Sequence, residues 1–322
     1  MKCKAFSRWG YFGRFNGLMN NSPIFIYLLL ALVFAGCGSG EDISIEYLND
    51  TYADENSNFL EIDGATIHYK DEGEGTPLVL LHGIGSSLHT WDGWTSELSK
   101  DFRIIRLDLP GFGLTGADST GSYTMERYIR VLNKFLGELA VDEYFLAGNS
   151  LGGWLAWEYA LDHPEGIKKL ILIDAAGFIT PDNPPKPLRL TQKFKKMTAK
   201  GAPKFAVRKF LKQAYGDRSK VTDELVNRYY ELNNRPGNGA AFYKIATADY
   251  NPRSTQLPEI QVPTLIMWGK EDKKWIDVSH AYLFEELLPN DQVIIYEGLG
   301  HIPMEEDPVK TAQDARQFLN QP

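Results

Sequence analysis

Residues 144–154 read YFLAGNSLGGW, and this stretch decides the fold. Its first four residues are apolar, as expected for a strand covered on both faces, and apolar residues at helical spacing follow from Trp154. Between them lies the pattern G-x-S-x-G, in which a Cβ at Gly148 or Gly152 would collide with the neighbouring strand or helix. The sequence therefore predicts a sharp strand-to-helix turn. This turn raises Ser150 clear of the sheet, at a helix N-terminus whose unpaired N–H groups favour an anionic oxygen.

On both sides of this stretch, apolar runs of strand length alternate with segments of helical period. Asp63 and Gly64 separate the first two runs, which predicts a hairpin. The alternation predicts an α/β fold with a mostly parallel eight-stranded sheet, helices on both faces, and functional residues at the C-terminal ends of the strands. The strands are expected at residues 59–62, 66–70, 78–81, 103–108, 144–147, 169–174, 263–268 and 292–296.

The first 36 residues are predicted to be a signal peptide. Four basic residues and no acidic one precede the apolar run 24–34, which is too short to span a bilayer comfortably. Ala-Gly-Cys37 follows and resembles the lipobox of bacterial lipoproteins, although Phe34 stands where leucine is usual. The resemblance implies lipidation of Cys37 and a location in the bacterial cell envelope, at the outer membrane or facing the periplasm. The alternatives are an uncleaved membrane anchor and a start at Met19.

Composition limits the remaining function classes. The chain has 322 residues, 43% of them hydrophobic, which suffices for one domain at residues 59–322 behind a polar, acidic tether at 37–58. The two cysteines, Cys3 and Cys37, allow no disulfide in a chain that begins at Cys37, and they exclude cysteine catalysis and cysteine-rich metal sites. Removing residues 1–36, with their four positive charges, changes the net charge from −8 to −12, which argues against nucleic-acid binding.

A serine nucleophile needs a histidine base and an acid that orients this base. The chain offers Ser150, then Asp272, then His301, each on a turn just after a predicted strand. Asp174, which ends the preceding strand, and Asp277 compete with Asp272 for the role of the acid. His301 is preferred to five other histidines, which lie in the edge hairpin, at a strand end or within predicted helices: His68, His82, His89, His163 and His280.

Residues of about 59–319 resemble the α/β-hydrolase fold superfamily. The resemblance is carried by His82-Gly83 with Trp91, and by the segments DLPGFG at 108–113, GNSLGG at 148–153, WGKED at 268–272 and GHIP at 300–303. It implies that Ser150, Asp272 and His301 form a catalytic triad. It also implies an oxyanion hole made by the backbone N–H groups of Leu151 and, most simply, Ile84. No metal or organic cofactor is implied.

The resemblance extends to substrate class. Carbon–carbon bond hydrolases of aromatic degradation often share Gly-Asn-Ser-x-Gly-Gly, but their loop usually reads H-G-x-G-P-G-A and their histidine usually precedes tryptophan. Here Ser86 follows Gly85, and Ile302 follows His301. These departures favour an esterase or lipase that acts on a small-molecule or lipid ester. The carbon–carbon hydrolases remain the alternative, and a catalytically silent binding module is a third class. The acyl chain, the alcohol and the oligomeric state are not indicated.

The alternation of strands and helices stops over about residues 179–252, where the resemblance implies a helical lid. This stretch holds fifteen Lys and Arg against six Asp and Glu, in an otherwise acidic chain. We expect its basic side to face an anionic membrane surface or anionic acyl substrates, the alternative being an ordinary solvated lid.

Overall fold

The computed structural model describes residues 42–178, 201–248 and 250–322. The predicted signal peptide, Cys37 and residues 179–200 of the predicted lid lie outside the described residues. None of the helices within the described ranges is long and apolar enough to cross a membrane.

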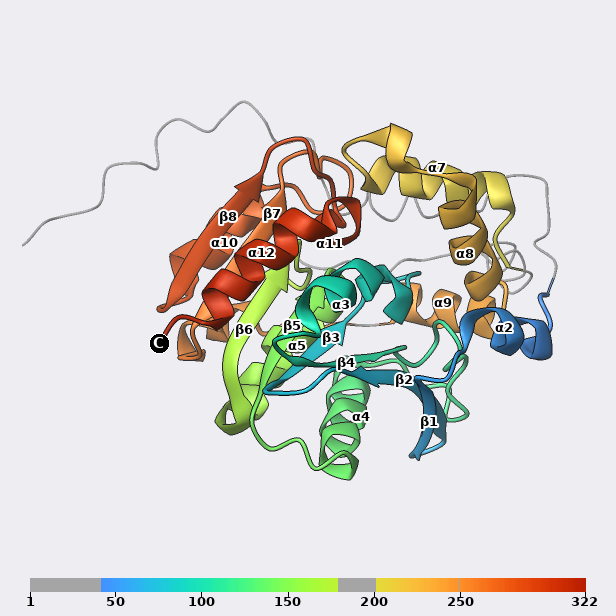
Figure 1. Ribbon diagram of the computed structural model, residues 1–322, viewed down its shortest axis with the longest axis horizontal. Helices are drawn as coiled ribbons and strands as arrows, with labels where there is room; N and C mark the ends of the chain where they lie inside the picture. Colours follow the sequence, from blue (N-terminus) through green and yellow to red (C-terminus); the bar gives the residue numbers. More distant parts are fainter. Residues whose placement is uncertain (1–41, 179–200, 249) are drawn as a thin grey trace, which may run out of the picture.

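One eight-stranded sheet forms the centre of the molecule, in the order β1-β2-β4-β3-β5-β6-β7-β8 (Figure 1). The strands from β4 to β8 pair in parallel, whereas β2 pairs antiparallel with both β1 and β4. The sequence-based prediction of a mostly parallel eight-stranded sheet with an antiparallel edge is thus confirmed. The bounds are β1 Ser57–Ile62, β2 Ala65–Glu72, β3 Pro77–Leu81, β4 Arg103–Leu107, β5 Tyr144–Asn149, β6 Ile167–Ile173, β7 Thr264–Gly269 and β8 Asp291–Tyr296.

Helices cover the sheet. Helices α3 and α12 lie side by side in front of it in Figure 1, where the indole N–H of Trp94 donates to the Thr311 hydroxyl at 2.9 Å. Helix α5 packs on the central strands, and all of its residues from Leu151 to Ala160 are buried. The bounds are α2 Ile45–Tyr52, α3 Asp92–Leu98, α4 Met125–Glu138, α5 Leu151–Asp162, α7 Lys204–Ala214, α8 Asp223–Asn233, α9 Asn238–Thr247, α10 Ser279–Leu287, α11 Pro303–Glu306 and α12 Pro308–Leu319.

Strand β5 lies at the centre of the core. Every residue of β5 is buried, and its neighbours β3 and β6 are almost as completely buried. Side chains on both faces of a central parallel strand meet helices, so the uninterrupted apolar runs of the sequence are what these strands require. The large buried side chains of Trp91, Trp94, Trp157 and Trp268 fill the space between sheet and helices.

Helices α7, α8 and α9 lie between β6 and β7 in the chain and form one group beside the sheet (Figure 1). We call residues 201–248 the insert. Helix α2, within the segment that the sequence predicted as a tether, packs against it. The hydroxyl groups of Tyr47 and Tyr52 donate to the Glu231 carboxylate of α8, at 3.3 and 2.7 Å, and Leu48 is buried against Leu232.

Candidate active site

Ser150 lies between β5 and α5 in a strained conformation, with φ 54° and ψ −114°. Few non-glycine residues adopt a positive φ, and such strain gathers at functional sites. The flanking glycines make the turn physically possible. A Cβ at Gly148 would lie 2.2 Å from the carbonyl oxygen of Gly152, and a Cβ at Gly152 would lie 2.2 Å from that of Leu81. The turn that the motif predicts is therefore present.

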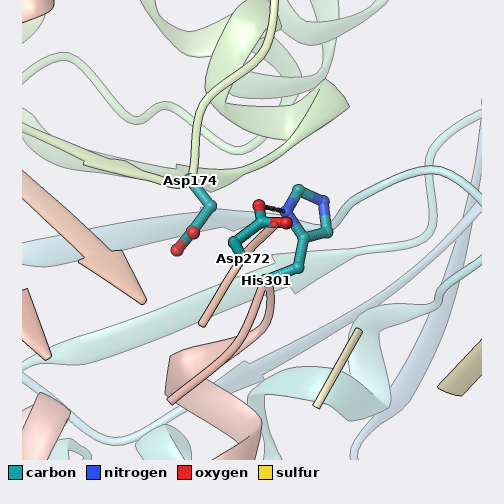
Figure 2. A group of neighbouring side chains, drawn as sticks. All are labelled: Asp174, Asp272 and His301. Carbon is teal, nitrogen blue, oxygen red and sulfur yellow. Dashed lines mark hydrogen bonds and ion pairs between the residues drawn. The ribbon is translucent and has the colours of Figure 1, made fainter. Parts of the chain in front are cut away.

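Asp272 and His301 are in direct contact, as Figure 2 shows. Asp272 follows β7, and His301 lies between β8 and α11. The Nδ1–H of His301 donates to Oδ2 of the fully buried Asp272 at 2.6 Å. The backbone N–H groups of Trp275 and Ile276 also donate to this carboxylate, each at 3.0 Å. The Asp272 carboxylate thus accepts three hydrogen bonds, and the one from His301 orients the imidazole with Nε2 left as the basic nitrogen.

Asn149, which lies within the G-x-S-x-G motif and was not among the predicted site residues, joins the turn bearing Ser150 to the loop bearing His301. Its Nδ2 donates to the carbonyl oxygens of Ile173, at 3.1 Å, and of His301, at 2.9 Å. The turn bearing Ser150 is thereby held against the loop bearing His301. On the other side of His301, the Trp275 ring stacks on the imidazole, with the ring centroids 5.9 Å apart.

The competing acids are placed differently. Asp174 is fully buried at the end of β6, with φ 42°, and both its carboxylate oxygens accept the Gly269 N–H, at 3.2 and 3.3 Å. Burial, followed by the negative charge of Asp272, raises the pKa of Asp174 well above its ordinary value. A neutral Asp174 does not balance an imidazolium. Asp277 accepts the Ser279 N–H at 3.0 Å, at the start of α10.

Asp174, Asp272 and His301 also form a group of metal-ligand type among the described residues. One possible ligand atom from each lies within 4.8 Å of the others (Figure 2). The Nδ1 of His301 is already bonded to Asp272, and Asp272 already accepts three hydrogen bonds. A cation bound through Nδ1 would have to displace the His301–Asp272 hydrogen bond. The donor set therefore fits a hydrogen-bonded acid–base pair better than a metal centre.

We call residues 83–88, which follow β3, the oxyanion loop. A Cβ on Gly83 would lie 3.1 Å from the Cβ of Ser150, so this loop touches the serine. The Ser86 N–H donates to the Gly83 carbonyl oxygen at 3.2 Å and closes a turn around Ile84. Within the described residues, neither the Ile84 N–H nor the Leu151 N–H donates a hydrogen bond. The oxyanion hole expected at these two N–H groups stays a prediction.

Other histidines have structural partners. His82 accepts the Leu109 N–H at Nε2, at 3.0 Å, and donates from Nδ1 to the Gly83 carbonyl oxygen, at 2.8 Å. Burial lowers the pKa of His82, so its neutral form is favoured. His68 bonds to Asp108 at 2.8 Å. Burial would raise the pKa of Asp108, but the hydrogen bond and charge of His68 outweigh it and hold that pKa at about 2.

Comparison with known proteins places these features in a family. Residues 76–308 match the family described as alpha/beta hydrolase fold. A 2-hydroxy-6-oxo-2,4-heptadienoate hydrolase of Pseudomonas putida is 29% identical over 248 residues, which cover 74% of this chain and 87% of that protein. Other relatives of comparable identity are also named as hydrolases of a dienoic acid or a semialdehyde.

A relative of another class is Lipase 3 of Moraxella sp., which is 28% identical over 260 residues, 77% of this chain and 78% of that protein. Among solved structures, the meta-cleavage product hydrolase of Pseudomonas fluorescens has a TM-score of 0.68 and 25% identity. The match covers 82% of this chain and 97% of that one.

Proposed function

Because this chain belongs to the α/β-hydrolase family, we propose that it is a serine hydrolase in which Ser150 attacks the carbonyl carbon of its substrate. The observation that carries the proposal is the His301–Asp272 hydrogen bond of 2.6 Å, formed in a loop that Asn149 ties to the strained turn of Ser150. In this mechanism Nε2 of His301 accepts the Ser150 proton while Asp272 stabilises the resulting imidazolium.

The rest of the cycle follows from the same groups. The N–H groups of Ile84 and Leu151 donate to the oxyanion of the tetrahedral intermediate. His301 then gives its proton to the leaving group, which departs and leaves an acyl group on Ser150. Water, deprotonated by His301, attacks this acyl-enzyme and releases the carboxylic acid. No step needs a metal or an organic cofactor.

The first candidate for the bond cleaved is a carbon–carbon bond beside a carbonyl, as in the meta-cleavage product hydrolases. The relatives support this alternative better than the ester hydrolase expected from the sequence, because several of them are named for such substrates. In this reaction the leaving group is a carbon atom, and His301 would deliver its proton there. In the overall reaction, the hydroxyl group of one water molecule enters the new acid, and one hydrogen enters the protonated fragment.

An ester substrate is the second candidate. Ser86 and Ile302 depart from the pattern that the carbon–carbon hydrolases usually show, and Lipase 3 matches this chain at nearly the same identity. An ester also needs the simpler proton transfer, because its leaving group is an oxygen that a nearby imidazolium protonates readily.

A side-by-side assay separates the two candidates. Wild-type protein and Ser150→Ala would be given 2-hydroxy-6-oxo-2,4-heptadienoate and a chain-length series of 4-nitrophenyl esters. We expect turnover of the dienoate, lost in Ser150→Ala. Turnover of esters alone would select the second candidate, and equal activity of wild type and Ser150→Ala would contradict the serine mechanism.

We further propose that the insert acts as a lid. The ring of Phe210, from α7, lies against Trp275 with centroids 4.7 Å apart, and Trp275 in turn stacks on His301. These contacting aromatic rings connect the insert to His301, the proposed base. The envelope location and the lipid at Cys37 are kept as proposals that rest on the sequence alone, as is a membrane-facing basic side of the insert.

A further inference from the structure

We propose that helix α8 of the insert holds the oxyanion loop in its active shape, with Tyr229 and Asn233 as positioning residues. This inference rests on the proposed function, because it concerns the N–H group of Ile84 that would bind the oxyanion. Neither side chain was singled out in the sequence, and neither is expected to touch the substrate's reacting atoms. Their contacts reach the loop from a helix about 140 positions further along the chain.

The Tyr229 hydroxyl forms two hydrogen bonds. It donates to Oε2 of Glu305 at 2.8 Å, and it lies 3.1 Å from Oγ of Ser86. A hydroxyl carries one proton, and a carboxylate can only accept. The Tyr229 hydroxyl therefore donates a hydrogen bond to Glu305 and accepts a hydrogen bond from the Ser86 hydroxyl. The direction of both hydrogen bonds is thereby fixed. The hydroxyl of Ser86, in the oxyanion loop, donates to Tyr229 of the insert.

Glu305 is held in its acceptor role. Its other carboxylate oxygen pairs with Nη2 of Arg228, the neighbour of Tyr229 on α8. Burial, followed by the negative charge of Glu305, raises the pKa of Tyr229, so its neutral, proton-donating form is maintained. Since Glu305 belongs to α11, four residues after His301, the Tyr229 hydroxyl connects the oxyanion loop to the element that follows the proposed base.

Asn233 makes the second contact from the same face of α8, four residues after Tyr229. Its Nδ2 donates to the carbonyl oxygen of Gly85 at 2.7 Å and to that of Tyr229 at 2.8 Å. Gly85 has a φ of +69°, a conformation that glycine adopts without a steric penalty. Helix α8 thus forms hydrogen bonds with the oxyanion loop at two successive residues, Gly85 and Ser86.

These contacts bear on the N–H of Ile84 through the geometry of one peptide unit. The Ser86 N–H donates to the Gly83 carbonyl oxygen at 3.2 Å. That carbonyl and the Ile84 N–H belong to the same planar peptide, so fixing one orients the other. Tyr229 holds Ser86, Ser86 holds the Gly83–Ile84 peptide, and this peptide presents the proposed oxyanion donor. A displacement of α8 would therefore weaken transition-state stabilisation without removing any catalytic group.

The matched test compares Tyr229→Phe with Tyr230→Phe. Tyr230 is adjacent on α8, and its hydroxyl makes no hydrogen bond within the described residues. Kinetics would be measured on whichever of 4-nitrophenyl butyrate and 2-hydroxy-6-oxo-2,4-heptadienoate the wild-type enzyme turns over. Losing an oxyanion donor outright lowers kcat by about 10²–10³, so a loosened donor should cost about tenfold in Tyr229→Phe, with KM nearly unchanged. Tyr230→Phe should match wild type.

Two further readouts separate positioning from a general structural role. A trifluoromethyl ketone forms an oxyanion on Ser150, and its affinity should fall about as much as kcat in Tyr229→Phe, with little change in melting temperature. Ser86→Ala should have a similar effect, and the double variant should be no worse than either single one, because both remove the same hydrogen bond.

Unchanged kcat and inhibitor affinity in both Tyr229→Phe and Ser86→Ala would overturn the inference. So would losses that simply follow a fall in melting temperature, or that add fully in the double variant. These outcomes leave the proposed function intact. Its failure is recognised separately, by activity that survives in Ser150→Ala.

Discussion

Replacing Asp174 by asparagine is expected to stabilise the protein increasingly as the pH rises, while leaving catalysis nearly unchanged. Asp174 is fully buried, and burial together with the charge of Asp272 raises its pKa well above 3.8. Asparagine has almost the same shape, can accept the Gly269 N–H through its oxygen, and tolerates the positive φ of 42° at this position. The substitution therefore removes the titration and keeps the contacts.

The size of the effect follows from proton linkage. An acid whose pKa is raised on folding contributes stability that is complete below its unfolded pKa and is lost as the pH rises towards its folded pKa. Each pH unit above 3.8 over which folded Asp174 keeps its proton therefore lowers the free energy of unfolding by about 1.4 kcal/mol. Asp174→Asn lacks this slope.

Urea unfolding of both proteins between pH 4 and pH 7 measures the difference directly. We expect the free energy of unfolding of Asp174→Asn to rise relative to wild type as the pH increases, and kcat to stay within a few-fold. Parallel pH profiles would refute the claim that Asp174 is protonated. A loss of kcat of several hundredfold would identify Asp174, in place of Asp272, as the ionised acid.

Three further predictions concern the nucleophile turn, the acid and the N-terminus. Asp272→Asn should lower kcat by about 10⁴ in steady-state assays, because the imidazole loses its orienting carboxylate; a near-normal kcat would contradict its role. Gly152→Ala places a Cβ 2.2 Å from the Leu81 carbonyl oxygen, and should destabilise the fold by about 3 kcal/mol in denaturant titrations; wild-type stability would show that the turn can relax. Cys37→Ser in the bacterial host should move the protein from the membrane to the soluble fraction, whereas an unchanged distribution would argue against a lipid anchor.

Much of the fold could be predicted from the sequence because a central parallel strand must be apolar on both faces. The uninterrupted apolar runs that form β3, β5, β6 and β7 are typical of strands buried on both faces. Edge strands carry a weaker signal. Strand β1 begins at Ser57, two residues before the predicted start, because the polar Ser57 and Asn58 pair with β2 through their backbone and need no burial.

The convergence of Asp272 and His301 was also predictable, since parallel strands bring the turns at their C-terminal ends to one edge of the sheet. The preference for Asp272 over Asp174 rested on the family resemblance, because both residues follow neighbouring strands. The structure separates them by hydrogen bonding: His301 bonds to Asp272, while Asp174 accepts the Gly269 N–H.

Contacts between distant parts of the chain left no signal in local periodicity. The bonds of Tyr229 to Ser86 and to Glu305 join residues 143 and 76 positions apart. Helix α2 likewise gave no sign that its tyrosines would bind α8, since its acidic composition is also that of a tether. The expectation of an ester substrate rested on two residues, Ser86 and Ile302, whereas several relatives are named for dienoate or semialdehyde substrates.

Labelling with a fluorophosphonate tests the central claim most directly, because it reports the nucleophile whatever the substrate is. Wild-type protein, Ser150→Ala and His301→Ala would be treated with the probe, and the modified peptide identified by mass spectrometry. We expect rapid labelling of Ser150 in wild type, none in Ser150→Ala, and much slower labelling in His301→Ala. Labelling at another residue, or equal rates in wild type and His301→Ala, would contradict a serine activated by His301.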